Sequence, residues 1–177
     1  MATSNFYYYD DLLNLYSITY DEALYNANAY CEYHNIDKDD DLECEKAFNE
    51  ANKGLRIFDE SEMEELENFI EELNKKIKDK AYRLYDSNRQ CDQDEYYNLI
   101  DCKIYIESGY YEGFQIAVSK DYQYLNKTNQ KMIQQMFKKI ARKFGMYAYT
   151  LAYRFSNGET GFHKVKEYKY EFDKVRV

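Results

Sequence analysis

The spacing of apolar residues changes from a helical period to a strand period near residue 100. Over residues 61–85 apolar positions recur every three or four residues, which predicts a long helix with one face on a core. These positions are Met63, Leu66, Phe69, Ile70, Leu73, Ile77, Ala81 and Leu84. After residue 100 apolar and polar residues alternate, as in strands. We therefore expect an α+β fold in which N-terminal helices pack with a C-terminal ββαββ antiparallel-sheet unit.

Capping signals set the expected helix boundaries in the first half of the chain. Thr19-x-x-Glu22 is a capping box and predicts a helix over residues 19–34. A second helix is expected over residues 42–53, followed by Gly54 at a position that needs a positive φ. Ser61-x-x-Glu64 is another capping box, which would open the long helix.

The second half predicts two hairpins around one helix. Residues 104–106 and 114–118 form the first hairpin, with Ser108-Gly109 near its turn. A helix over residues 128–144 ends at Gly145, and Asn157-Gly158 joins strands over residues 146–155 and 161–168. The loop over residues 86–94 is the candidate boundary between an acidic helical part (residues 1–90) and the ββαββ part (residues 91–177). We expect these two parts to form one compact unit.

Charge is distributed unevenly along the chain, whose 177 residues carry a formal net charge of −9. Residues 1–100 hold 25 acidic and 10 basic side chains, whereas residues 101–177 hold 8 acidic and 14 basic ones. This asymmetry indicates an electrostatic partner, or attraction between the two halves as they fold. No run approaches the ~20 apolar residues that span a bilayer. Phe and Tyr make up 18% of the chain, which argues against disorder.

No catalytic, metal or cofactor motif is found in the sequence. The two histidines, His34 and His163, do not lie beside a Ser or Cys in a nucleophile motif. Cys31, His34 and Cys44 offer too few zinc ligands, and residues 37–48 lack the Gly and Glu of a calcium loop. The six glycines form no phosphate-binding loop. We expect no catalytic residue, no metal and no cofactor, and we expect all four cysteines to be free thiols. An enzyme with an unfamiliar site is a third interpretation, besides the two binding functions considered next.

An acidic stripe on the long helix is the strongest functional signal. Four of its glutamates follow one line: Glu60, Glu64, Glu67 and Glu71. Residues 59–72 hold eight carboxylates in 14 positions, and at ~1.5 Å per residue this is one charge every ~2.6 Å, against ~1.7 Å for duplex DNA. Like charges at this spacing destabilise a helix by roughly 0.2–0.5 kcal/mol per pair. The stripe therefore predicts a surface that mimics nucleic acid and binds a basic protein, although a solvated face near a helix N-terminus is the simpler interpretation. A second acidic segment, the turn of Asp39, Asp40 and Asp41, is expected to belong to the same binding surface.

A basic stripe on the helix over residues 128–144 supports the alternative function. It consists of Lys131, Lys138 and Arg142, with Gln134 and Gln135 between them. With exposed tyrosines nearby, it could contact phosphates and stack on bases, as in a nucleic-acid-binding or regulatory protein. Three charges are few in an acidic chain, so we do not expect direct binding of nucleic acid. The simpler interpretation is a solvated helix surface with cations toward its C-terminal end.

Tyrosine is abundant, with 22 residues in the chain. Tyr110, Tyr111 and Glu112 lie near the turn of the first hairpin. Adjacent residues of an extended segment point to opposite faces, so one ring should pack under the hairpin and the other should face a partner. Because Tyr buries a large area with few rotatable bonds, it is favoured at interfaces. We therefore include these three residues in the expected binding surface.

A resemblance to a known class comes from one segment of this hairpin, Ile106-Glu107-Ser108-Gly109-Tyr110-Tyr111-Glu112-Gly113-Phe114-Gln115-Ile116. The segment resembles a hairpin of small phage and plasmid proteins from low-GC bacteria. Small acidic single-domain proteins of that origin resemble anti-CRISPR and other anti-defence inhibitors. The resemblance implies a non-enzymatic inhibitor that occupies a basic nucleic-acid-binding surface of a host defence nuclease by acidic DNA mimicry. Its partner would be a basic host protein, such as a CRISPR nuclease or its guide complex. Residues 6–11 do not read as a secretory signal, so we expect the host cytoplasm and no membrane.

Overall fold

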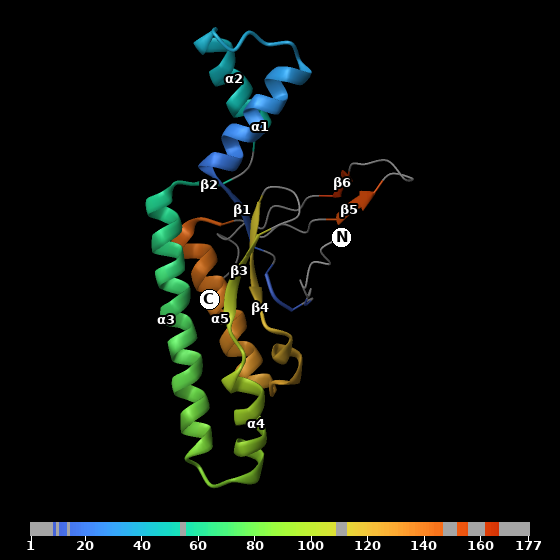
Figure 1. The fold of residues 1–177 in the computed structure, drawn as a ribbon. Coiled ribbons are helices and arrows are strands. Elements are labelled where there is room, and N and C mark those ends of the chain that lie inside the picture. The colour runs from blue at the N-terminus through green and yellow to red at the C-terminus, as the bar shows by residue number, and fades with distance from the viewer. Residues whose placement is uncertain are drawn as a thin grey trace.

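The computed structural model describes residues 9, 11–13, 15–53, 56–108, 113–146, 152–155 and 162–166 (Figure 1). Its helices are α1 (Tyr20–Tyr33), α2 (Asp41–Ala51), α3 (Glu60–Tyr85), α4 (Gln90–Ile100) and α5 (Lys127–Phe144), with the short 3-10 helix η1 (Lys120–Tyr124) before α5. Its strands are β1 (Tyr16–Thr19), β2 (Ile57–Phe58), β3 (Ile104–Ser108), β4 (Phe114–Val118), β5 (Ala152–Phe155) and β6 (Phe162–Lys166). The fold is α+β, as the sequence predicts.

Four of the strands form one mixed sheet in the order β2-β1-β4-β3. β1 is parallel to β2 and antiparallel to β4, and β4 is antiparallel to β3. The predicted hairpin of β3 and β4 is confirmed, because Ile104 lies opposite Val118 in its register. Gly113 stands before β4 where any Cβ would collide with the ring of Tyr16 on β1. This glycine therefore leaves room for the Tyr16 ring beside the start of β4.

The sheet differs from the predicted ββαββ unit in two respects. β1 and β2 come from the N-terminal part of the chain, so both parts contribute strands to one sheet. β5 and β6 pair antiparallel with each other in a separate two-stranded sheet. The sequence does not predict β1 or β2 because they are four and two residues long, and so short a segment shows no clear alternation.

The hydrophobic core lies between the sheet and helices α3, α4 and α5. α3 and α5 run alongside the strands in Figure 1. The apolar face predicted for α3 is buried at Leu66, Ile70, Leu73, Ile77 and Ala81. α5 buries the face that contains Ile133, Phe137 and Ile140. It ends at Gly145, whose φ of 63° is a left-handed conformation that glycine adopts without strain.

Helices α1 and α2 form a hairpin that extends away from the sheet (Figure 1). Asn52, at the C-terminal end of α2, joins the two helices and is only 5% exposed. Its Nδ2 donates to Ala23 O at 3.0 Å and to Phe48 O at 2.9 Å, and its Oδ1 accepts from Asn26 Nδ2 at 3.2 Å. α2 thus ends at Ala51, and Gly54 lies outside the described residues.

The two capping boxes of the sequence have different outcomes. Thr19 caps α1 and accepts a hydrogen bond from Glu22 N at 3.4 Å, which confirms the predicted start of this helix and the Thr19 half of the box. The box starting at Ser61 is wrong, because Asp59 caps α3 two residues earlier. Asp59 accepts from Glu62 N at 2.8 Å, and the Glu62 carboxylate accepts from Asp59 N at 3.4 Å. Asp and Ser are both good N-cap residues, and each of the two is followed by a Glu three residues later. The sequence therefore does not show which of the two residues caps α3.

Helix α4 occupies part of the segment expected to be a loop. The turn covers only residues 86–89, where Asn88 has a left-handed φ of 56°. α4 then packs against α3. Its start at Arg89 has no side-chain cap, and it buries only Glu95 and Leu99. Because both a cap and a continuous apolar face are missing, the sequence does not reveal this helix.

Candidate functional site

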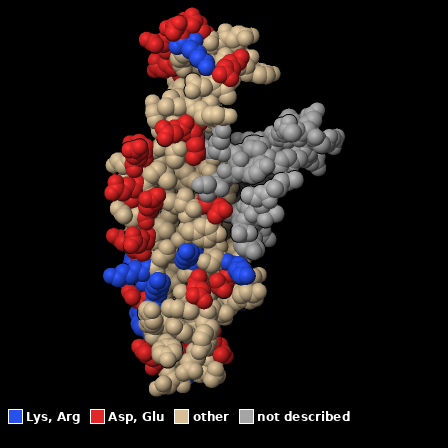
Figure 2. All heavy atoms as spheres, viewed as in Figure 1, with Lys and Arg blue, Asp and Glu red and all other residues tan. Residues whose placement is uncertain are grey.

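The predicted acidic stripe lies on the exposed side of α3. All four of its side chains are exposed: Glu60, Glu64, Glu67 and Glu71. Figure 2 shows acidic side chains gathered along one part of this helix and basic side chains gathered further along it. The helix dipole favours carboxylates mainly within the first turn. It therefore accounts for Glu60 and does not account for the other three glutamates.

Three of these glutamates line a groove between the starts of α1 and α3. The groove forms because β1 and β2 are parallel, with Thr19 opposite Phe58, and each strand leads directly into a helix. Its volume is about 950 Å³, and Glu60, Glu64 and Glu67 line one side. Tyr20 and Asp21 contribute from α1. Parallel pairing thus brings together two helix starts that are 40 residues apart in the sequence.

The groove combines an apolar base with an aromatic ring at its side. Phe58 is fully buried and Met63 is half-buried, and both line the groove. The side chain of Tyr20 is 50% exposed. A ligand with an apolar stem and a polar end could therefore contact both kinds of surface.

The groove carries net negative charge. Five carboxylates line it: Asp21, Asp59, Glu60, Glu64 and Glu67. The N-termini of α1 and α3 each contribute about half a positive charge, which together offset only one carboxylate. Neither Lys nor Arg occurs among the described residues that line the groove. The arrangement therefore favours a cationic ligand.

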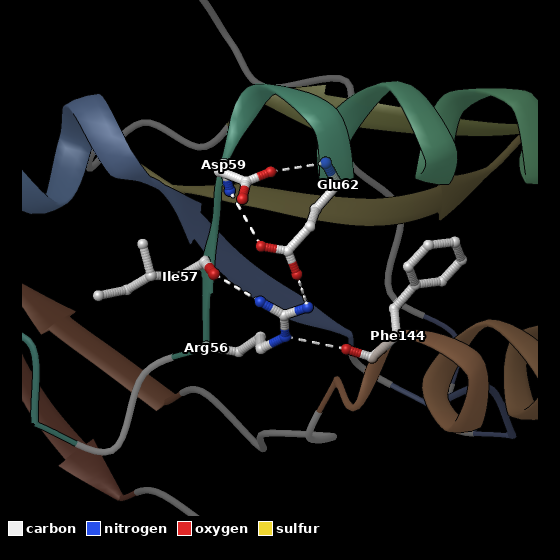
Figure 3. A network of polar contacts seen from close by, with 5 residues as sticks. All are labelled: Arg56, Ile57, Asp59, Glu62 and Phe144. Atoms are coloured by element: carbon white, nitrogen blue, oxygen red, sulfur yellow. Dashed lines mark hydrogen bonds and ion pairs between the residues drawn. The ribbon is translucent and has the colours of Figure 1, made fainter.

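Arg56 holds the start of α3 in place (Figure 3). Its Nε donates to Phe144 O at 3.0 Å, at the end of α5. The other guanidinium nitrogens donate to Ile57 O and to the Glu62 carboxylate. The guanidinium also lies 4.2 Å from the centre of the Phe58 ring. This one side chain therefore connects β2, α3 and α5 behind the groove.

Three of the eight carboxylates in residues 59–72 are engaged within the chain. Asp59 caps α3, and Glu65 Oε1 lies 3.8 Å from Lys143 Nζ. Glu62 bonds to Arg56, and this hydrogen bond lowers the pKa of the Glu62 carboxyl. The other five glutamates have no such contact with a described residue: Glu60, Glu64, Glu67, Glu71 and Glu72. They are spread over about 18 Å of helix, or one per ~3.6 Å. That spacing matches phosphates along one DNA strand, ~3.4 Å, and is wider than the spacing of duplex charge.

Cations already lie between a ring and a carboxylate at two places beside α3. One is Arg56, between Phe58 and Glu62. The other is Lys143, whose Nζ lies 5.3 Å from the centre of the Phe69 ring and 3.8 Å from Glu65 Oε1. The groove presents the same two components, the ring of Tyr20 and several carboxylates, without a cation from the described residues. This supports a cationic side chain of a partner as its ligand.

Glu71, the fourth member of the stripe, lies outside this groove. It borders a separate hollow of about 590 Å³ together with Glu72, Lys75 and Lys78. Two lysines beside it reduce the local negative charge. Glu71 therefore contributes less to the attraction of a cation than the three glutamates of the groove.

The second predicted acidic segment lies at the tip of the α1–α2 hairpin. Asp39, Asp40 and Asp41 are all exposed. Asp40 caps α2 by accepting from Glu43 N at 3.2 Å, and Asp39 N donates to Asp37 Oδ1 at 3.0 Å. Figure 2 shows acidic side chains over this hairpin apart from those along α3. The structure thus places the two acidic segments in two separate patches.

The basic stripe of the alternative function is only partly exposed. Lys131 and Arg142 are exposed, and Lys138 is half-buried. Gln134, which was expected between them, bonds inside the chain, with Nε2 3.0 Å from Asp11 Oδ2 and 3.0 Å from the Tyr122 hydroxyl. The stripe is therefore less continuous than its spacing predicts.

The expected tyrosine site lies outside the described residues. Tyr110, Tyr111 and Glu112 are not among the described residues, so their exposure stays a prediction.

The structure adds aromatic residues that the sequence did not single out. Tyr20 immediately follows the cap Thr19, a signal that places it in the first turn of α1. Its position beside α3 depends on the parallel pairing of β1 and β2, which the sequence does not reveal. A second aromatic cluster lies between α3 and α4, with Tyr96 5.0 Å from Tyr85 and 5.3 Å from Tyr97, measured between ring centres.

No protein family model, curated protein or solved structure matches this chain. Over the part that the structure describes, no group of three or more His, Cys, Asp and Glu side chains could hold a metal ion. Within the same residues, none of the helices is both long enough and apolar enough to cross a membrane.

Proposed function

We propose that this chain is a non-enzymatic inhibitor from a phage or another mobile element. It occupies a basic nucleic-acid-binding surface of a host defence nuclease, such as a CRISPR nuclease or its guide complex, in the host cytoplasm. One observation carries the proposal: the exposed carboxylates Glu60, Glu64 and Glu67 line a groove together with Tyr20 and Asp21.

The groove has the components that bind a Lys or Arg side chain of a partner. The carboxylates pair with the cationic end, and the Tyr20 ring adds a cation–π contact. The exposed part of Met63 packs against the aliphatic stem. A protein that binds phosphates exposes many such side chains, so the groove suits its nucleic-acid-binding face.

The exposed glutamates beyond the groove would guide the partner to it. Complementary charge raises the rate of association more than it raises affinity. The tip of Asp39, Asp40 and Asp41 offers a second contact, and Tyr110, Tyr111 and Glu112 offer further anchors. Nucleic acid and this chain would compete for the same surface of the partner.

The test uses capture from a bacterial lysate followed by elution with nucleic acid. The full-length protein should retain basic proteins at physiological salt, and added duplex DNA or RNA should release them. Release should also follow a rise in salt, because the contacts are ionic. Capture that nucleic acid does not reverse would contradict occupancy of a nucleic-acid-binding surface.

A gel shift separates this proposal from the alternative function. The isolated protein should not bind random duplex DNA or RNA at physiological salt. Micromolar affinity for either would overturn the proposal. It would instead favour nucleic-acid binding through Lys131, Lys138 and Arg142.

A further inference from the structure

Two cysteines lie near the turn of the α1–α2 hairpin, one on each helix. Cys31 on α1 is 4% exposed, Cys44 on α2 is half-buried, and both are free thiols. The Cys31 thiol is among the neighbours that raise the pKa of the Cys44 thiol. The two residues belong to helices that are consecutive in the chain and pack together.

Both cysteines are tied to the turn that connects these helices. Cys44 Sγ lies 3.6 Å from Asp37 O and 3.5 Å from Lys38 O. Cys31 O accepts a hydrogen bond from Ile36 N at 2.9 Å. At the other end of the hairpin, Asn52 bonds to α1 and α2. The helices are thus fixed at both ends, which holds the two sulfurs near each other.

We propose that Cys31 and Cys44 are a modification site, where a reversible disulfide locks the α1–α2 hairpin. The bond would join the helices beside the acidic tip of Asp39, Asp40 and Asp41. A disulfide requires the sulfurs to approach to about 2.05 Å and the two Cα atoms to lie within about 7 Å of each other. The packing of α1 against α2 brings the two helices into contact. This inference does not depend on the proposed function.

A low-molecular-weight disulfide, such as oxidised glutathione, supplies the oxidant. The more exposed Cys44 loses its proton to solvent, and the thiolate attacks one glutathione sulfur and releases the first glutathione thiolate. Cys31, also deprotonated, then attacks the Cys44 sulfur and releases the second glutathione thiolate. The two protein thiols are oxidised to one disulfide, and one glutathione disulfide is reduced to two glutathione molecules.

The surroundings of Cys44 set the conditions for this reaction. Burial and the neighbours Cys31, Asp40 and Asp41 raise the pKa of the Cys44 thiol. The thiolate is therefore scarce at neutral pH, and the oxidation should be run at about pH 8.5.

The two other cysteines serve as internal controls. Cys91 is exposed on α4, so it should form a mixed disulfide with glutathione. Cys102 is buried, and burial raises the pKa of its thiol to about 12, so it should stay reduced.

The test treats the full-length protein with oxidised glutathione and digests it without reductant for mass spectrometry. The expected product joins the Cys31 and Cys44 peptides with the loss of two hydrogens, and dithiothreitol separates them. The Cys91→Ser variant should give the same product, and the Cys44→Ser variant should not. Glutathione on Cys91 with Cys31 and Cys44 left unlinked would overturn the proposal.

Hydrogen exchange tests the effect of the bond on the hairpin. In the Cys91→Ser variant, oxidation should slow amide exchange in α1 and α2 by roughly tenfold, because the cross-link restricts opening. Exchange in α3 and α5 should not change. A linked product with unchanged exchange in α1 and α2 would overturn the lock.

Discussion

Asn74 on α3 hydrogen-bonds to both backbone groups of Ile104 on β3. Its Nδ2 donates to Ile104 O at 2.8 Å, and its Oδ1 accepts from Ile104 N at 2.7 Å. β3 is an edge strand of the four-stranded sheet, so within the described part of the chain Ile104 has a neighbouring strand on one side only. The Asn74 amide takes the place of a further strand at that position. It therefore attaches α3 to the sheet and covers part of the sheet edge.

Replacing this amide should destabilise the fold. In Asn74→Ala the backbone N–H and C=O of the fully buried Ile104 lose their partners, so the free energy of unfolding should fall by roughly 1–3 kcal/mol. Urea denaturation measures the change, and hydrogen exchange at the Ile104 amide should accelerate. The control is Asn68→Ala, an exposed position of the same helix, where the change should stay within about 0.5 kcal/mol. Equal effects of the two substitutions would contradict this role of Asn74.

Helices with a continuous apolar face could be predicted from the sequence. The burial of Leu66, Ile70 and Leu73 on α3 follows from their spacing alone. The end of α5 at Gly145 follows from the conformational freedom of glycine. The register of β3 and β4 is local as well, since a short connection joins the two strands.

The groove could be predicted only in part, because it depends on a contact between distant segments. Exposed glutamates on α3 follow from the helical period. Their position opposite Tyr20 requires Ile18 of β1 to pair with Ile57 of β2, 39 residues away. β2 has two residues and no pattern of its own, so its pairing depends on the packed core around Phe58. Tertiary packing, which local sequence does not encode, therefore creates the second wall of the site.

The Arg56–Glu62 pair should make stability depend on acid. The Arg56 hydrogen bond lowers the pKa of Glu62 in the folded state, whereas an unfolded Glu has a pKa of about 4.3. The unfolded state then binds more protons as pH falls through this range. The contribution of Glu62 should therefore be full above about pH 5.5 and should be lost as pH drops through 4.3 toward the lower folded pKa.

Melting temperatures at a series of pH values test this dependence. The wild-type protein should be more stable than Glu62→Gln above about pH 5.5, and the difference should shrink as the pH falls below about 4. Glu64→Gln serves as the control, because Glu64 is exposed and has no ion pair with a described residue. Parallel curves for wild type and Glu62→Gln would contradict the lowered pKa.

Removing the charge of the acidic stripe should weaken binding without loss of stability. The variant Glu60→Gln, Glu64→Gln, Glu67→Gln and Glu71→Gln relieves two like-charge pairs at i,i+4, each worth roughly 0.2–0.5 kcal/mol. Its melting temperature should be unchanged or slightly higher. Its affinity for an alternating arginine–glycine peptide should fall roughly tenfold at low salt, and the difference should shrink as salt rises.

A matched variant separates the position of these charges from their number. Asp79, Asp86, Asp94 and Asp101 are exposed, and none of them lines the groove. Their replacement by Asn removes the same formal charge. At the same low salt its effect on peptide affinity should be less than threefold, because these carboxylates lie away from the groove and the attraction between charges falls with distance. An equal loss in both variants would mean that only net charge attracts the peptide.

Removing the aromatic ring of the groove should weaken binding by a smaller factor. In Tyr20→Ala the carboxylates stay, and the lost cation–π contact of about 0.5–1 kcal/mol corresponds to a two- to fivefold lower affinity for the arginine–glycine peptide. Tyr20→Phe should restore most of it, since the ring and not the hydroxyl makes the contact. The control is Tyr25→Ala on the same helix, which is 59% exposed and does not line the groove. Titration calorimetry measures all three variants. If Tyr25→Ala weakens binding as much as Tyr20→Ala does, the peptide is attracted to α1 in general and the groove has no specific role.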